Sequence, residues 1–172
     1  MKKELDNYLV EKYPKIFINR NGDMTETGMC WGFQHNNGWF WLVDQLCDSI
    51  QNYIDINNSY REEDNKIQQV VATSVKEKYG VLSFNYYNGD NLIDGMTRLA
   101  ENMSANTCEF CGSIHDVGRT SGWIYTICKE CYTNTSEKRI SSLPWKINKN
   151  SLSLSKIRKI KLDILNNVEK IK

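Results

Sequence analysis

Apolar side chains recur every three or four residues in three stretches of the chain, which predicts three amphipathic helices. The first covers residues 3–13 and ends before Pro14, which cannot continue a helix. The second lies within residues 36–54 and has the clearest pattern, and the third runs from about 91 to 104. In the second helix, the side chains expected to pack in the core are Phe40, Val43, Leu46, Cys47, Ile50 and Ile54. In the third helix, one apolar face is expected to consist of Met96, Leu99, Ala100 and Met103. The solvent-facing side of the third helix would then carry Asp94, Arg98 and Glu101.

Between the second and third helices the pattern changes to alternation. Apolar or aromatic side chains alternate with polar ones over residues 82–86, the period of a half-buried strand. A second run of similar character precedes Tyr79 and Gly80, and glycine suits a turn that needs a positive φ. These features predict a β-hairpin with its tip at Tyr79-Gly80.

Composition indicates a folded protein inside the cell. Hydrophobic residues make up 40% of the 172 residues, and five of them are tryptophans. The N-terminus has no apolar run of signal-peptide length, and no window reaches the roughly 18 apolar residues of a membrane span. We therefore expect a soluble, cytoplasmic protein with no membrane contact. In a reducing compartment disulfides among the six cysteines are disfavoured, and metal binding is the better interpretation for four of them.

Charge is distributed unevenly along the chain. Residues 1–136 carry 12 Lys and Arg against 18 Asp and Glu, a net of −6, and residues 137–172 carry 10 against 3, a net of +7. The C-terminal segment also predicts a basic amphipathic helix, which could pack on the acidic body, bind nucleic acid, bind a partner protein, lie on a membrane surface or form a homodimer. Its apolar stripe would be Ile157, Ile160, Ile164, Val168 and Ile171, and its basic face Lys156, Arg158, Lys159 and Lys161.

The strongest chemical signal is a cysteine quartet, Cys108-x2-Cys111 and Cys128-x2-Cys131. Two such pairs have the spacing of a tetrahedral four-thiolate Zn²⁺ site, with a short β-ribbon between them. Four thiolates leave no position for water or substrate, so the zinc would be structural. His115 lies nearby and is not needed as a ligand.

Other residues suggest binding or catalysis more weakly. Arg119 and Trp123 offer a cation and a stacking surface to a nucleic acid or a partner, although the ribbon from Cys108 to Cys131 has only two basic residues against three acidic ones. Cys30 precedes His35 by five residues, which resembles a nucleophile and base, but no third orienting residue can be identified. Buried structural roles are expected for Cys30 and Cys47. No phosphate-binding loop or metalloprotease motif is present, so we predict a protein that is not an enzyme.

Five stretches together resemble a group of small, mostly uncharacterised proteins encoded by phages and prophages. These are "EKYPKIF", "MTETGMCWGFQHNNGWFWLVDQLCDSI", "SVKEKYGVLSFNYYNGD", "LIDGMTRLAENMSANTCEFCG" and "SGWIYTICKEC". The resemblance covers about residues 8–132. Proteins of this group end in a zinc-ribbon-like quartet, and a cysteine often stands where this chain has His35. The resemblance implies a mobile-element protein in the cytoplasm of a bacterial host.

These observations predict an α+β fold in three parts. Residues 1–106 form a body of helix, helix, β-hairpin and helix, 107–136 form a zinc ribbon, and 137–172 form a connector and the basic amphipathic helix. The first functional hypothesis is a non-enzymatic inhibitor that binds a host protein machine, such as a CRISPR-type defence effector or another nuclease complex. The alternative is an accessory protein that binds nucleic acid through the ribbon and the basic helix.

Overall fold

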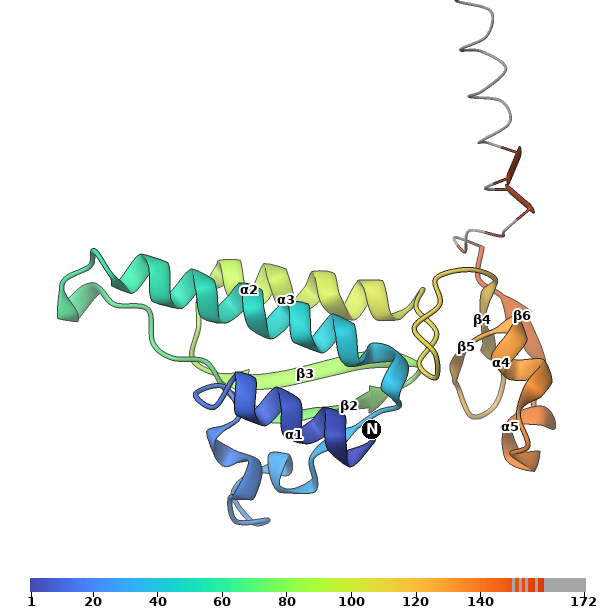
Figure 1. Ribbon diagram of the computed structural model, residues 1–172, viewed down its shortest axis with the longest axis horizontal. Helices are drawn as coiled ribbons and strands as arrows, with labels where there is room; N and C mark the ends of the chain where they lie inside the picture. The colour runs from blue at the N-terminus through green and yellow to red at the C-terminus, as the bar shows by residue number, and fades with distance from the viewer. Residues whose placement is uncertain (150, 152, 154, 157, 160–172) are drawn as a thin grey trace, which may run out of the picture.

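The computed structural model describes residues 1–149, 151, 153, 155, 156, 158 and 159 (Figure 1). It is a mixed structure, 46% helix and 18% strand, which confirms the α+β class. Among these residues, no helix has the length and apolar character needed to cross a membrane. The predicted stripe from Ile157 to Ile171 and the basic residue Lys161 lie outside the described residues.

The body and the ribbon follow one another along the chain. The body contains α1 (Lys3–Lys12), β1 (Phe33–Gln34), α2 (Phe40–Asn58), β2 (Val71–Lys78), β3 (Val81–Tyr87) and α3 (Asn91–Ser104). The ribbon contains β4 (Val117–Thr120), β5 (Thr126–Cys128), α4 (Lys129–Asn134), α5 (Lys138–Ser141) and β6 (Trp145–Ile147). Short 3₁₀ turns at Ile18–Asn21, Gly28–Trp31, Asn37–Trp39 and Glu63–Asn65 complete the body.

The body is built on a three-stranded sheet in the order β1-β2-β3. Strands β2 and β3 are antiparallel and occupy the two segments on either side of the predicted turn. Tyr79 and Gly80 both have positive φ, 54° and 76°, as a two-residue turn of type I′ requires. Strand β1 pairs with the other edge of β2 in parallel orientation, with Phe33 opposite Val75.

Helices α2 and α3 lie side by side above this sheet (Figure 1). α3 begins at Asp90, whose side chain accepts hydrogen bonds from the backbone N–H groups of Leu92 and Ile93, an N-cap. A single apolar core joins the helices to the sheet and to the N-terminal segment. Its fully buried side chains include Leu9, Ile16, Phe17, Met29, Trp39, Val43, Ile50, Val70, Leu82 and Ile93.

The orientation of α3 corrects the sequence prediction. Glu101 accepts a hydrogen bond from the backbone N–H of Phe84 (3.1 Å), and Asp94 accepts one from the hydroxyl of Tyr86, so both carboxylates reach β3. This rotation exposes part of the predicted apolar face: Leu99 is 61% exposed and Met103 42%. Ala100 of the predicted face is buried, together with Ile93, Thr97 and Ser104.

The ribbon has a three-stranded sheet of its own, in the order β5-β4-β6. Strand β6 lies in the segment predicted to be a connector, so the ribbon sheet extends past residue 136. Gly118 permits this pairing, because a Cβ atom there would lie 2.4 Å from the carbonyl oxygen of Lys146. The indole N–H of Trp145 donates to the carbonyl of Ile127 (3.0 Å) and closes the sheet over a small core.

Candidate metal centre

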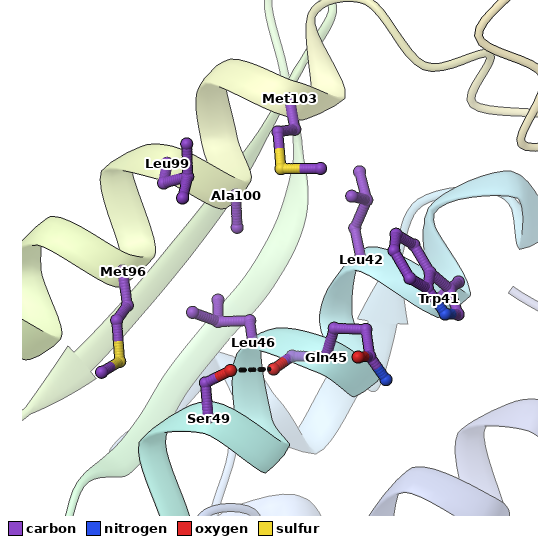
Figure 2. Close-up of a pocket in the computed structure, with 9 residues that line it drawn as sticks. All are labelled: Trp41, Leu42, Gln45, Leu46, Ser49, Met96, Leu99, Ala100 and Met103. Carbon is purple, nitrogen blue, oxygen red and sulfur yellow. Dashed lines mark hydrogen bonds between the residues drawn. The ribbon is translucent and has the colours of Figure 1, made fainter. Parts of the chain in front are cut away.

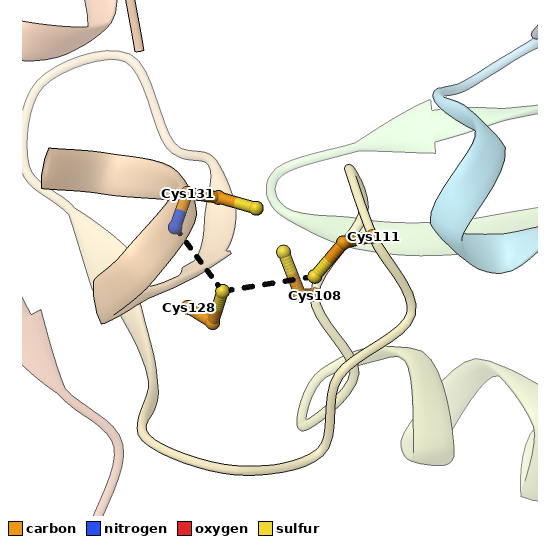
Figure 3. Close-up of side chains that lie close together, drawn as sticks. All are labelled: Cys108, Cys111, Cys128 and Cys131. Atoms are coloured by element: carbon orange, nitrogen blue, oxygen red, sulfur yellow. Dashed lines mark hydrogen bonds between the residues drawn. The ribbon is translucent and has the colours of Figure 1, made fainter. Parts of the chain in front are cut away.

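The four predicted cysteines come together at the base of the ribbon (Figure 3). All four Sγ atoms lie within 4.8 Å of one another, and those of Cys111 and Cys128 are 3.7 Å apart. Four sulfur atoms at about 2.3 Å from a tetrahedral ion are about 3.8 Å apart. The spacing of the thiols therefore fits one metal ion.

The first pair of cysteines is held by a tight backbone loop. The N–H of Cys108 donates to the carbonyl of Ser113 (2.7 Å), and the N–H of Gly112 donates to the carbonyl of Cys108 (2.8 Å). Gly112 has φ +79°, a conformation that glycine adopts without strain. The glycine directly after the second cysteine thus lets the loop turn back, so that both thiols face the same point.

The second pair lies where β5 passes into α4. Cys128 is the last residue of the strand, and Cys131 is in the first turn of the helix. The N–H of Cys131 donates to Sγ of Cys128 (3.4 Å). The strand-to-helix junction therefore orients two thiols toward the first pair.

Electrostatics explain why this cluster suits a cation. Burial raises the pKa of the Cys108 thiol to about 12, and burial together with the neighbouring thiols raises the pKa of Cys131. Without a positive charge these thiols keep their protons near neutral pH. A bound metal ion would neutralise the thiolates and release those protons. With four protein ligands it would have no open position for a substrate.

Two further contacts fix the first pair of cysteines to the body, and the sequence analysis did not identify them. The indole N–H of Trp39 donates to the carbonyl of Thr107 (2.9 Å), and the N–H of Gly38 donates to that of Glu109 (2.7 Å). A Cβ on Gly38 would lie 2.2 Å from the carbonyl oxygen of Cys108, so any larger residue there would displace the loop that carries the first pair of cysteines. The sequence signal that could have indicated these contacts is the Gly38-Trp39 pair at the start of the second helix.

Two other predicted site residues of the ribbon lie at its surface, where Arg119 is half-buried and Trp123 is exposed. Arg119 is directly opposite Lys146 of β6, and Trp123 is 54% exposed with the Arg139 guanidinium 4.2 Å from its ring centroid. His115 is not part of the cysteine cluster. Within the C-terminal segment, Lys156, Arg158 and Lys159 are exposed.

Cys30 and His35 do not form a nucleophile pair among the described residues. The Cys30 thiol donates to the carbonyl of Thr27 (3.0 Å), and Nδ1 of His35 bonds the carbonyl of Asn36 (2.8 Å). Burial lowers the pKa of His35 to about 4, so the ring is neutral. Cys47 is fully buried in α2, and burial raises its pKa.

A second candidate site is an apolar groove between α2 and α3 (Figure 2). It has a volume of about 170 Å³ and adjoins a second hollow of about 450 Å³ that reaches the first pair of cysteines. Trp41, Leu42 and Met103 line both. The other side chains of the groove are Gln45, Leu46, Ser49, Met96, Leu99 and Ala100.

No protein-family model, curated protein or solved structure matches this chain. We therefore base the functional proposal on the cysteine cluster and the exposed surfaces.

Proposed function

We propose that this protein is a non-enzymatic binding protein whose ribbon is held together by a structural zinc ion. Thiolate-rich tetrahedral sites select zinc or iron, and a closed four-cysteine shell with two Cys-x2-Cys pairs is typical of structural zinc. The ion would supply folding free energy to a segment with few buried apolar side chains. Its positive charge would keep Cys108, Cys111, Cys128 and Cys131 as thiolates.

The observation that carries the binding function is the groove between α2 and α3. Trp41 is 59% exposed and Leu99 61%, and Met96 and Met103 add flexible side chains. Two helices that flank an apolar groove are suited to receive a third, amphipathic helix. Residues 1–106 carry 10 Lys and Arg against 15 Asp and Glu, a net of −5, so the partner helix we propose is basic.

The identity of the partner is proposed from the resemblance to phage proteins. Small phage proteins of this kind often act by covering the surface of a host machine. We therefore propose that the partner is a defence complex of the bacterial host, such as a CRISPR-type effector. Inhibition would then result from steric blocking by the groove and the surface around it.

The test is capture of partners from host lysate by the tagged full chain, with proteins identified by mass spectrometry. Leu99→Asp places a charge in the groove, and Ile56→Asp is the matched control because Ile56 is equally exposed (61%) and does not line the groove. We expect Leu99→Asp to lose a protein that Ile56→Asp retains. Equal capture by both variants would contradict binding through the groove. Light scattering that shows a dimer dissociated by Leu99→Asp would identify a second copy as the occupant instead.

Nucleic-acid binding by the ribbon is the second candidate, and the structure adds an observation in its favour. Because β6 and α5 join the ribbon, residues 107–149 carry 6 Lys and Arg against 4 Asp and Glu, a net of +2. Glu109, one of the four acids, is only 2% exposed. The test is binding of short single and double strands at two salt concentrations, where phosphate contacts predict affinity that falls as salt rises.

A further inference from the structure

A pocket of about 290 Å³ lies where the hairpin tip of the body meets the loop between β4 and β5. It is distinct from both the cysteine cluster and the apolar groove. We infer that this pocket binds a nucleobase of a single-stranded nucleic acid, with guanine as the preferred base. The inference rests on the second proposed function and deepens it. The pocket is lined by Glu77, Lys78, Tyr79, Gly122, Trp123 and Ile124.

The two walls of the pocket are fixed to one another. The hydroxyl of Thr126 donates to the carbonyl of Gly80, and a Cβ on Gly80 would lie 2.6 Å from Cγ2 of Ile124. The N–H of Gly80 also donates to Oε1 of Glu77 (2.6 Å), which braces the turn from within. The tip of the hairpin therefore packs tightly against the ribbon loop, and the pocket exists before any ligand arrives.

Tyr79 is an unusual residue for its position. It occupies the first central place of the turn at φ 54°, where asparagine or glycine is favoured and a bulky side chain is strained. Tyr79 is 74% exposed, so packing contacts within the described fold do not offset the energy of this backbone strain. Strained residues cluster at binding sites. The turn thus presents a large aromatic ring at the pocket.

Trp123 supplies a second aromatic ring from the other wall. The hydroxyl of Thr120 donates to the backbone carbonyl of Trp123 (2.7 Å) and fixes the loop. Arg139 lies against the indole ring, 4.2 Å from its centroid, yet Trp123 is still 54% exposed. Aromatic side chains of this kind bind flat heterocycles by stacking, and every nucleobase has such a face.

Cations lie on the same side of the ribbon. In β-sheets, directly opposed residues share a face, and Arg119 is opposite both Thr126 of β5 and Lys146 of β6. Because the hydroxyl of Thr126 contacts the hairpin tip, Arg119 and Lys146 extend from the face that looks toward that tip. Lys78 lines the pocket itself. These three side chains are placed to contact the phosphates that flank a bound base.

Glu77 gives the site a preference among bases. It lines the pocket, and it has a second carboxylate oxygen besides the one that accepts from Gly80. A carboxylate only accepts hydrogen bonds at neutral pH, so it favours a base edge that donates. Guanine presents adjacent ring and amino N–H donors that can pair with one carboxylate. Thymine lacks an amino group and is disfavoured.

The experiment measures binding of three labelled five-nucleotide strands to the full chain by fluorescence anisotropy. One strand contains only thymidine, one has a central guanine and one has a central abasic site. We expect the guanine strand to bind about tenfold more tightly than the abasic strand, the effect of one stacked base. Tyr79→Asn should remove this difference while it relieves the strained turn, so the variant should be at least as stable as the wild type.

Matched variants separate the parts of the site. Tyr87→Ala and Trp31→Ala remove exposed aromatic rings elsewhere, so both variants should still bind the guanine strand about tenfold more tightly than the abasic strand. Glu77→Gln should instead reduce the preference for the guanine strand over the thymidine strand. If all three strands bind equally and with salt dependence, the ribbon contacts phosphate alone and the base pocket is wrong. If the guanine strand still binds about tenfold more tightly than the abasic strand in Tyr79→Asn, the base binds elsewhere and the inference is overturned. If no strand binds, both the pocket and the second proposed function fail.

Discussion

The body and the ribbon have different sources of stability. The core of the body brings together 21 buried side chains from helices, strands and connecting turns between Leu9 and Ala100. The described part of the ribbon has five buried apolar side chains, Cys108, Val117, Ile127, Cys128 and Ile140, two of which are members of the cysteine cluster. Hydrophobic burial can stabilise the first region by itself, whereas the second is too small for that. One chain thus combines a region that its apolar core can stabilise with a region whose buried centre is a cluster of potential metal ligands.

The largest expected effect is on the ribbon, from the loss of the zinc ion that we propose it binds. Cys108→Ser removes one of four ligands, and structural zinc contributes about 10–16 kcal/mol to the folding of comparable small units at neutral pH. We expect the variant to lose bound metal and the dispersed NMR resonances of residues 107–148, while resonances of α2 and β2 remain. Loss of the body resonances as well would show that the two regions do not differ in this way.

The complementary change weakens the body and leaves the metal in place. Ile50 is fully buried in α2, so Ile50→Ala should lower the free energy of unfolding by about 2–5 kcal/mol. Urea denaturation measures this loss, and metal content should remain at the wild-type value. Ile56→Ala is the control, since Ile56 is 61% exposed in the same helix. A drop in metal content in folded Ile50→Ala would contradict the separation of the two regions.

Acid should destabilise the body through His35, independently of the metal. The ring has a pKa of about 4 in the folded protein, because burial disfavours its charged form, and about 6.5 when unfolded. The unfolded chain therefore binds the proton first, and stability falls by about 1.4 kcal/mol per pH unit as the pH drops from about 6.5 to 4. Denaturation curves at several pH values check this slope for the body, and His35→Asn should flatten it. An unchanged slope in the variant would exclude His35 as the cause.

The smallest effect concerns the junction between the two regions. Gly38→Ala places a methyl group against the carbonyl of Cys108, so the first pair of cysteines has to shift away from the 3₁₀ turn that precedes α2. Accommodating one added methyl group in a tight contact costs about 1–3 kcal/mol. We expect both regions to stay folded, with faster hydrogen exchange at the backbone N–H of residue 38 and the indole N–H of Trp39, which donate to the carbonyls of Glu109 and Thr107. Gly95→Ala is a suitable control, because nothing lies within 4 Å of a Cβ there. Identical exchange in both variants would contradict a role for Gly38 in holding the ribbon.

Features that depend on local spacing could be predicted from the sequence. The two Cys-x2-Cys pairs predicted a metal-binding cluster because each short loop can hold two thiols close together, and the structure places all four side by side. Asp90 directly precedes the third helical stretch, where aspartate is a favoured N-cap, and it accepts from two backbone N–H groups of α3. The identity of the metal remains a proposal.

Features that depend on contacts far apart in the sequence could not be predicted in this way. The apolar stripe of α3 suggested a buried face, but hydrogen bonds from β3 to Asp94 and Glu101 rotate Leu99 and Met103 outward. β6 has only three residues, too few for an alternating pattern, and it pairs with β4 because Gly118 leaves room for it. The groove and the pocket at the hairpin tip follow from such long-range contacts, which local periodicity does not encode.

Hydrogen exchange with and without a chelator is the most direct test of the central claim, that one metal ion folds the ribbon on an independently stable body. The full chain is first weighed by native mass spectrometry, which should show one zinc ion per chain. On chelation, amides of residues 107–148 should lose protection, while those of α2, β2 and β3 keep theirs. A metal-free chain with a protected ribbon, or loss of protection throughout the body, would contradict this account.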